Sequence, residues 1–162
     1  MNTIGEKKMA FHIVLVEPEI PANTGNIART CAATGAHLHL VRPLGFSTDD
    51  KQLKRAGLDY WQAVNIEYHD SFADLQQKYS EATYYYASTK GKKSYSEFTY
   101  KDGDFLVFGK ETKGLPEELI NSNLETCIKM PMTDAVRSLN LSNTVCAILY
   151  EALRQNNFPN LN

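Results

Sequence analysis

The sequence Met130-Pro131-Met132-Thr133-Asp134-Ala135-Val136-Arg137-Ser138-Leu139-Asn140-Leu141-Ser142 joins a short apolar segment to an amphipathic one. A simple connection between a strand and a helix usually needs about 2–6 residues. This one is about twice as long, and it still carries Met, Val and Leu side chains that could pack. Long ordered loops at the carboxyl ends of strands are where ligands bind in open α/β sheets. We therefore expect this stretch to be a ligand-binding loop around which the rest of the chain is arranged.

The segments on either side of this loop are expected to be a strand and a helix. Residues 126–130 read as the last strand of the chain, and Ser142 is expected to cap the helix that follows the loop. Apolar side chains recur in that helix at i, i+3, i+4, i+7 and i+8, namely Val145, Ile148, Leu149, Ala152 and Leu153. The loop thus connects two well-defined elements.

The amino-terminal part of the chain has the pattern of a β-loop-α-β unit. Residues 11–16, Phe-His-Ile-Val-Leu-Val, form a nearly continuous apolar run, which is typical of a strand buried on both faces of a parallel sheet. A helix is expected over residues 25–34, capped by Asn23 or Thr24, and a second strand over residues 37–41. This unit indicates an α/β fold.

The same alternation continues through the rest of the chain. Further strands are expected over residues 64–68, 83–87 and 105–108. Further helices are expected over residues 49–55, over residues 71–79, and from Pro116, which suits the first helical position. The pattern predicts a mainly parallel sheet flanked by helices, in a single domain over residues 11–158 behind a flexible lead-in over residues 1–10.

Composition excludes several classes of protein. The 162 residues are 43% hydrophobic and 22% charged, which is ordinary for a globular domain. No run approaches the ~18 apolar residues of a membrane span, and the start of the chain lacks a signal-peptide pattern. We expect a cytoplasmic protein with no membrane partner. The net charge of −2 gives no overall nucleic-acid signature, although basic residues cluster locally at Lys51, Lys54, Arg55, Lys90, Lys92 and Lys93.

Cysteine and histidine usage predicts neither disulfides nor a metal site. The cysteines Cys31, Cys127 and Cys146 are odd in number and form no Cys-x-x-Cys pair, so buried reduced thiols are expected. His37 and His39 share one face of a predicted strand, but no third ligand is spaced near them in the sequence. We therefore expect no bound metal.

Three loops at strand ends are candidates for chemistry: residues 23–29, residues 108–116 and the opening stretch. In the second loop, Gly109-x4-Gly114 resembles the start of a phosphate-binding P-loop. That motif requires Lys and then Ser or Thr after the second glycine, and here Leu115 and Pro116 follow. The sequence also lacks a Gly-x-Gly-x-x-Gly after the first strand and a Gly-x-Ser-x-Gly elbow. Nucleotide-triphosphate, dinucleotide and serine-hydrolase sites of these types are thereby excluded.

Each candidate residue has a structural as well as a functional interpretation. Gly109 could let a ligand approach the backbone closely, and Met130, Leu139 and Leu141 could wall an adenine-sized slot or could simply be core. Glu111 could receive a cation or a hydroxyl, or could order its loop. For two further groups of residues the sequence leaves both a functional and a structural interpretation open. Arg29 either reaches a phosphate or is a solvated helix residue, while Asn23 and Asn26 either act in catalysis or serve as turn and cap residues.

Taken together, the three loops resemble the SPOUT class of S-adenosylmethionine-dependent RNA methyltransferases. The first matches the motif Asn-x-Gly-Asn-x-x-Arg at Asn23, Gly25, Asn26 and Arg29. The second matches Phe-Gly-x-Glu-x-x-Gly-Leu at Phe108, Gly109, Glu111, Gly114 and Leu115. The third matches Ile-x-Met-Pro-Met at residues 128–132 followed by Ser-Leu-Asn-Leu-Ser at residues 138–142. Residues 17–26, 43–46 and 54–60 further resemble the TrmL-type tRNA 2′-O-methyltransferases, with Lys110 as a departure from the usual pattern.

The resemblance implies a fold, an assembly and a set of site residues. It implies a carboxyl-terminal deep trefoil knot, a homodimer, and S-adenosyl-L-methionine as cofactor with S-adenosyl-L-homocysteine as product. The cofactor contacts carry over onto Ala87, Gly109, Ile128, Met130, Ser138 and Leu139. The catalytic candidates are Asn26, Arg29, Glu111 and Ser142, where Ser142 either contacts RNA or only caps the helix. The candidates for RNA binding are Lys54, Arg55, Lys90 and Arg154.

The activity that the resemblance implies is 2′-O-methylation of the ribose of the wobble nucleotide, position 34, in tRNA. The substrate would be a cytidine or a modified uridine in the anticodon stem-loop, with leucine tRNAs expected. A ribose 2′-hydroxyl would attack the methyl group in line, and Arg29 would bind a neighbouring phosphate or stabilise the developing alkoxide, because an arginine side chain does not give up its proton in proteins. The alternatives are a methyltransferase for another RNA such as rRNA, a non-catalytic RNA-binding module, and a flavodoxin-like binding or redox protein.

Overall fold

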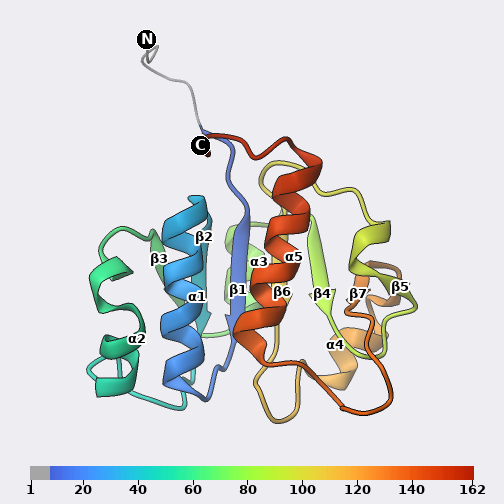
Figure 1. Ribbon diagram of the computed structural model, residues 1–162. Coiled ribbons are helices and arrows are strands. Elements are labelled where there is room, and N and C mark those ends of the chain that lie inside the picture. Colours follow the sequence, from blue (N-terminus) through green and yellow to red (C-terminus); the bar gives the residue numbers. More distant parts are fainter. Residues whose placement is uncertain (1–7) are drawn as a thin grey trace.

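A seven-stranded sheet forms the middle layer of the molecule, and every strand pair in it is parallel (Figure 1). The computed structural model describes residues 8–162, except for the side chains of residues 56–59. Most of the expected lead-in over residues 1–10 therefore lies outside the described residues. The strands lie in the order β3-β2-β1-β6-β4-β7-β5. Their bounds are β1 His12–Val16, β2 His37–Val41, β3 Ile66–His69, β4 Tyr84–Ala87, β5 Lys93–Ser94, β6 Phe105–Phe108 and β7 Cys127–Lys129.

The centre of the sheet is buried, as the apolar runs in the sequence predicted. In β1, Ile13 pairs with Leu38 of β2 on one side and with Leu106 of β6 on the other, and all three side chains are buried. A strand with neighbours on both edges and helices on both faces needs apolar side chains in both directions. The expected strands over residues 11–16, 37–41 and 105–108 are thus confirmed within one residue at each end.

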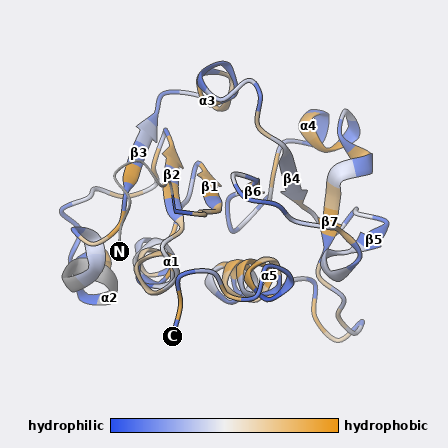
Figure 2. Ribbon diagram, turned by 90° about the horizontal axis from the view of Figure 1, so that it is seen from above, coloured by the Kyte–Doolittle hydropathy of each residue, from blue (hydrophilic) through white to orange (hydrophobic). Residues whose placement is uncertain are grey.

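Helices cover both faces of the sheet (Figure 2). Helices α1 and α5 lie on one face, and α3 and α4 lie on the other. Helix α2 packs beside α1, on the same side of the sheet (Figure 1). The helices are α1 Pro21–Thr34, α2 Lys51–Trp61, α3 Phe72–Lys78, α4 Glu117–Asn121 and α5 Leu141–Gln155, with short 3-10 turns at Tyr95–Glu97 and Leu124–Thr126.

Several predicted helix ends differ from those in the structure. Helix α1 begins at Pro21 rather than Gly25, because proline tolerates the first helical position, where its missing N–H has no partner to lose. Asn23 and Thr24 are therefore buried within the first turns and do not cap the helix. Helix α5 is capped by Asn140 and not by Ser142. Pro116 occupies the N-cap position of α4, where its side chain makes no hydrogen bond, instead of being the first residue of the helix.

The connection from β6 to β7 passes over a strand that lies between them. Strand β4 lies between β6 and β7, so the segment that leaves β6 passes over β4 before it enters β7. Helix α5 then returns to the opposite face and packs beside α1 (Figure 1). Because these strands are all parallel, the loops that follow β1, β4, β6 and β7 share one edge of the sheet.

Candidate functional site

Two glutamates bind the loop after β1 to the loop after β6. The carboxylate of Glu111 accepts hydrogen bonds from the backbone N–H groups of Glu19 (2.8 Å) and Ile20 (3.3 Å). In return, Glu19 accepts from the backbone N–H (3.1 Å) and the hydroxyl (2.7 Å) of Thr112. The pKa of Glu19 is lowered, chiefly by the hydrogen bond from the Thr112 side chain. Glu111 thus orders its loop and fixes the backbone at the start of α1.

A side chain at position 109 would collide with the protein's own backbone, so this position requires glycine. A Cβ at this position would lie 2.1 Å from the carbonyl carbon of Gly114 and 2.2 Å from the nitrogen of Leu115. The loop closes there through a hydrogen bond of 2.8 Å from the N–H of Gly114 to the carbonyl of Lys110. The sequence predicted that Gly109 makes room for a ligand. In the structure the returning backbone takes up that space, and this close contact is the reason for the glycine.

An asparagine pair joins the first loop motif to the third. The side-chain amide of Asn140 donates to the side-chain carbonyl of Asn23 at 3.1 Å. The other amide atom of Asn140, its Oδ1, accepts from the N–H groups of Ser142 (2.9 Å) and Asn143 (3.3 Å) and so caps α5. The hydroxyl of Ser142 also donates to this oxygen. Ser142 is therefore a half-buried member of the first turn, held by the residue that caps the helix.

The predicted cofactor residues fall into two groups. Gly109, Ala87 and Ile128 come together, because they lie on or directly after β6, β4 and β7, which are adjacent strands. Met130 follows β7 and is half-buried, whereas Ser138 and Leu139 lie in an exposed loop, with Leu139 44% exposed. The sheet edge thus brings three of the six residues together, while the three that follow β7 lie on its loop.

The two remaining catalytic candidates lie further along α1. Asn26 and Arg29 are both exposed, and the guanidinium of Arg29 lies over the ring of Tyr60 in α2 at 5.1 Å from its centroid. A cation over an aromatic face is stabilised by about 0.5–1 kcal/mol at an exposed site. Arg29 is thus positioned by α2 and remains accessible to an anionic ligand.

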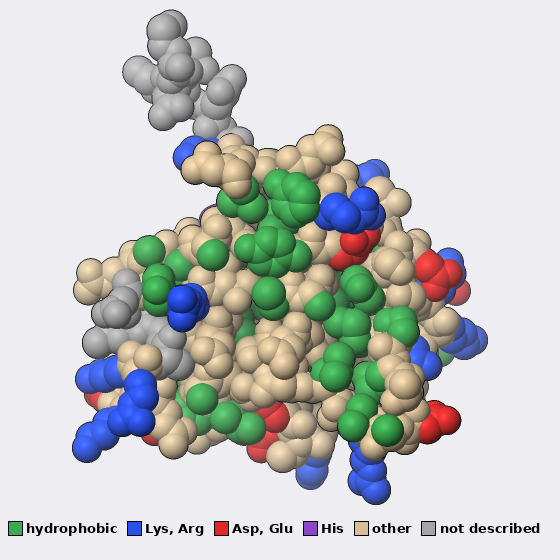
Figure 3. Space-filling view, viewed as in Figure 1, with side chains coloured by type: hydrophobic (Ala, Val, Ile, Leu, Met, Phe, Trp, Pro, Cys, Tyr) green, Lys and Arg blue, Asp and Glu red, His purple; other side chains and the backbone are tan. Residues whose placement is uncertain are grey.

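The predicted RNA-binding residues differ in how they are held. Figure 3 shows Lys and Arg side chains gathered over α2, where Lys54 and Arg55 are exposed. Lys90 pairs with Glu117 at 3.3 Å in an exposed ion pair of small energy, which a phosphate could replace. Arg154 makes a two-pronged contact with Glu151, at 2.9 and 2.7 Å. Of these four residues, Arg154 alone is held by a contact that would compete strongly with RNA for its side chain.

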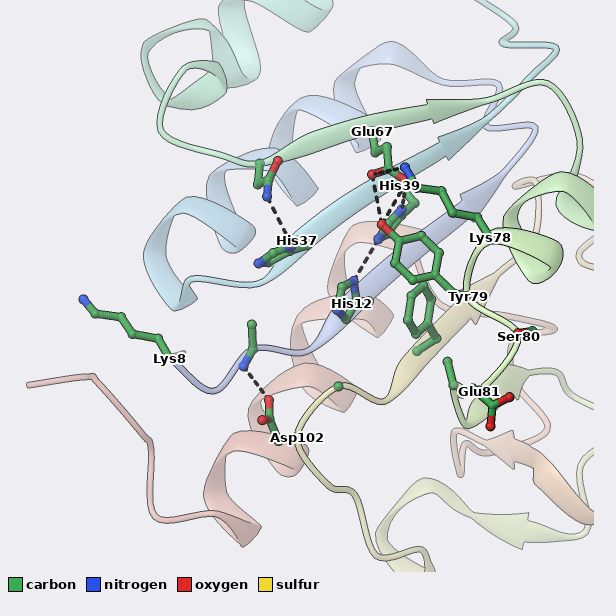
Figure 4. A pocket seen from close by; sticks show the side chains of 15 residues that line it. Lys8, His12, His37, His39, Glu67, Lys78, Tyr79, Ser80, Glu81 and Asp102 are labelled. Carbon is green, nitrogen blue, oxygen red and sulfur yellow. Dashed lines mark hydrogen bonds and ion pairs between the residues drawn. The ribbon is translucent and has the colours of Figure 1, made fainter. Parts of the chain in front are cut away.

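A histidine cluster on the α3 face was missed by sequence reasoning (Figure 4). The sequence predicted that no third ligand lies near His37 and His39. In the structure His39 lies beside Glu67 and His69 of β3, and it contacts His12 of β1. Burial, followed by the neighbouring His12, lowers the pKa of His39 to about 3. The strand order β3-β2-β1 creates this cluster, and no local spacing shows it.

No helix of the described residues is long and apolar enough to cross a bilayer.

Comparison with known proteins identifies relatives over almost the full length of the chain. A protein of Bacillus subtilis, provisionally named a tRNA (cytidine(34)-2′-O)-methyltransferase, is 57% identical over 94% of this chain and 98% of its own. The tRNA (cytidine(34)-2′-O)-methyltransferase of Escherichia coli is 45% identical over 92% and 96%.

Solved structures share the fold. One that describes 2-OH methylation of C/U34 on tRNA is 47% identical, covers 92% of this chain and 97% of its own, and superposes with a TM-score of 0.87. A more distant one, AviRb of Streptomyces viridochromogenes in complex with AdoMet, is 23% identical over 93% of this chain and 62% of its own, with a TM-score of 0.81. The model of the SpoU rRNA Methylase family matches residues 10–150. The chain therefore belongs to the SpoU methylase family.

Proposed function

We propose that this protein transfers a methyl group from S-adenosyl-L-methionine to the ribose 2′-hydroxyl of nucleotide 34 in tRNA. The observation that carries the proposal is the near full-length identity of 45–57% with relatives named for that reaction. The meeting of the three loop motifs at one sheet edge supports it, because ligands bind at the carboxyl ends of the strands in open α/β sheets. The expected substrate is a cytidine or a modified uridine in the anticodon stem-loop, with leucine tRNAs as the first isoacceptors to test.

The cofactor would be held by backbone and apolar groups at the carboxyl edge of the sheet. We assign this role to Ala87, Gly109, Ile128, Met130, Ser138 and Leu139. When bound, S-adenosyl-L-methionine supplies an electrophilic methyl group. Asn23 and Asn140 hold the third loop against the start of α1, and Glu111 holds the second loop there, so both loops keep a fixed position relative to the cofactor. Positioning of this kind is the main contribution that the chain makes to an in-line displacement.

Arg29 would act on the RNA. A guanidinium cannot accept a proton, so Arg29 does not serve as a base. We assign to it the phosphate next to the reacting ribose or the charge that develops on the attacking oxygen, with the proton leaving to water. Two neighbouring polar groups could orient the ribose. One is Asn26, which lies about one turn before Arg29 on the same exposed side of α1, and the other is Ser142 at the start of α5.

The decisive experiment is methylation of tRNA pools with labelled cofactor, followed by mapping of the modified nucleotide. We expect label at position 34. Arg29→Ala should retain cofactor binding and lose at least about 100-fold in kcat/KM. Arg42→Ala is the matched control, because Arg42 also lies 5.1 Å from a tyrosine ring centroid, that of Tyr68, and should leave the rate unchanged. Wild-type methylation by Arg29→Ala would overturn the assigned role.

Ribosomal RNA is the second candidate substrate, because the matching family model is described by rRNA methylation. Nucleoside analysis of a deletion strain separates the two. Loss of 2′-O-methylated nucleosides from tRNA supports the proposal, and loss from rRNA replaces it. A titration that shows no cofactor binding would instead favour a non-catalytic RNA-binding module.

We further propose that the chain forms one domain over residues 11–158, that its carboxyl-terminal part is knotted, and that it works as a cytoplasmic homodimer. The connection from β6 to β7, which passes over β4, and the return of the chain into α5 after β7 are compatible with the knot that the family resemblance implies. Exposed large apolar side chains at Ile20, Val136 and Leu139, each 43–50% exposed around the site, support a partner surface. The described cysteines are free, as expected for a reducing compartment. Sedimentation of the full chain tests the dimer.

A further inference from the structure

Three side chains on neighbouring strands, His39, Glu67 and His69, bring their ligand atoms within 4.8 Å of one another on the α3 face of the sheet. Figure 4 shows two of them, His39 and Glu67. Nδ1 of His39 and Nε2 of His69 are 2.9 Å apart. Oε2 of Glu67 lies 3.0 Å from Nε2 of His69 and 3.6 Å from Nδ1 of His39. His39 is 1% and His69 7% exposed, so this triangle lies against the body of the protein.

The size of this triangle matches one face of a tetrahedral metal site. Zinc binds imidazole nitrogen at about 2.0–2.1 Å and carboxylate oxygen at about 2.0–2.2 Å. Tetrahedral angles then place the ligand atoms roughly 3.3–3.5 Å from one another. The three measured separations, 2.9, 3.0 and 3.6 Å, lie around that value. An ion about 2 Å from all three atoms would sit just above their plane.

Hydrogen bonding alone satisfies this triangle poorly. Each neutral imidazole carries a single N–H. If His69 Nε2 carries its proton, that proton must be shared between Glu67 and His39. If His39 Nδ1 carries one toward His69 instead, the lone pairs of His69 and Glu67 face each other at 3.0 Å. If both facing nitrogens carry their protons, the two N–H groups point at each other across 2.9 Å. A divalent cation satisfies all three lone pairs at once.

The groups behind the triangle orient it as metal ligands are usually oriented. The second ring nitrogen of His39 contacts Nδ1 of His12 at 2.9 Å. The carboxylate of Glu67 accepts from the hydroxyl of Tyr79 at 2.9 Å and pairs with the ammonium of Lys78 at 3.1 Å. Partners of this kind fix the tautomer of a ligating histidine and the rotamer of a ligating carboxylate. Lys78 is largely exposed, so its screened charge opposes a cation only weakly.

We propose that His39, Glu67 and His69 form a binding site for a divalent first-row transition-metal ion, with Zn²⁺ as the expected occupant. Two imidazoles and one carboxylate suit this class of ion. A water from the adjoining groove, whose volume is about 780 Å³, would complete the tetrahedron. The ion would clamp β2 to the edge strand β3, on the opposite face of the sheet from α1 and α5. The proposal does not depend on the methyl-transfer activity.

The test uses the full chain, freed of any polyhistidine tag and stripped with a chelator. Titration with Co²⁺ should give the visible absorption of a tetrahedral ion at one equivalent per chain, and Zn²⁺ should abolish it. Glu67→Gln and His69→Gln should each weaken Co²⁺ binding by more than about 100-fold, and His12→Asn, which removes the partner of the second ring nitrogen of His39, by about 10–100-fold. His37→Gln is the matched control on the same strand as His39, because His37, which contacts Asn65 and the ring of His12, is not one of the three ligands, and this variant should bind Co²⁺ as the wild type does.

Two further measurements keep the result interpretable. Far-UV circular dichroism establishes whether each variant is folded. For the wild type alone, Zn²⁺ and not Mg²⁺ should raise the midpoint of thermal unfolding, since an ion that binds only the folded chain stabilises it. The proposal is overturned if the wild type gives no tetrahedral Co²⁺ spectrum, if folded Glu67→Gln and His69→Gln bind Co²⁺ unchanged, or if the spectrum shows thiolate charge transfer, which would place the ion on a cysteine.

Discussion

Asn140 links two parts of the chain that are 117 residues apart in sequence. Its amide nitrogen reaches Asn23, and its amide oxygen caps α5, so one short side chain fixes both the loop and the helix after it. Glu111 and Glu19 act in the same manner between the other two loops. At this scale the polar residues of the three motifs bind the motifs to one another, and this leaves Arg29, Asn26 and the apolar loop residues for ligands.

Asn140→Ala tests the link. Loss of the cap should cost about 1 kcal/mol of unfolding free energy, and loss of the hydrogen bond to the buried Asn23 a further ~0.5–1.5 kcal/mol. Denaturant unfolding at a fixed protein concentration measures the sum. Asn143→Ala, at an exposed neighbouring position, is the control and should change stability by less than about 0.5 kcal/mol. Equal effects of the two variants would contradict the capping role.

Asp104 gives the folded state a specific dependence on pH. Burial raises the pKa of this carboxyl above its usual 3.8, although a hydrogen bond from the N–H of Lys101 acts in the opposite direction. The folded chain therefore holds this proton more tightly than the unfolded chain, and stability is lost as pH rises through the window above 3.8. Asp104→Asn keeps an acceptor for Lys101 and cannot ionise. We expect the stability of this variant to increase relative to the wild type between pH 3 and pH 7 in denaturant titrations; a constant difference would refute the prediction.

The shape of the loop after β6 depends on two glycines. Gly109 packs against the backbone of Gly114 and Leu115, and Gly114 itself has a φ of 69°. The two glycines are needed for different reasons: the first for close contact, the second for a left-handed backbone. Sequence alone singled out both positions but assigned the first to a ligand, because the returning backbone cannot be foreseen from a local pattern.

Gly109→Ala and Gly114→Ala separate these reasons. Gly114→Ala meets no atom within 4 Å, so it should cost only the ~1–2 kcal/mol of a left-handed alanine. Gly109→Ala would place a Cβ 2.1 Å from the Gly114 carbonyl carbon, so the loop must move. We expect it to cost more stability than Gly114→Ala and to weaken cofactor binding at least about 10-fold, as measured by calorimetry, since a misplacement of about 1 Å can have effects of this size. Equal losses in the two variants would exclude the close contact as the cause.

Across the whole molecule, stability is expected to be graded from the sheet centre to α2. Strands β1 and β6 pair on both edges and are buried on both faces. Of the α2 side chains that the structure describes, only Leu53 is buried. Native-state hydrogen exchange should therefore show the slowest amides in β1 and β6 and the fastest helical amides in α2. Protection of α2 equal to that of β1 in the free protein would contradict this gradient, and slowing of α2 on addition of tRNA would support its basic face as an RNA surface.

The sequence by itself determined the α/β alternation, most strand positions, the three loop motifs and the family resemblance, because each of these is written in residues close together along the chain. The tertiary structure alone decided that Asn140 and not Ser142 caps α5, that Pro21 starts α1, and that Gly109 is enclosed by Gly114. It also decided that His12, His39, Glu67 and His69 converge. Those outcomes depend on strand order and on contacts between residues far apart in sequence, and the hydrophobic periodicity that predicts an element does not specify which element becomes its neighbour.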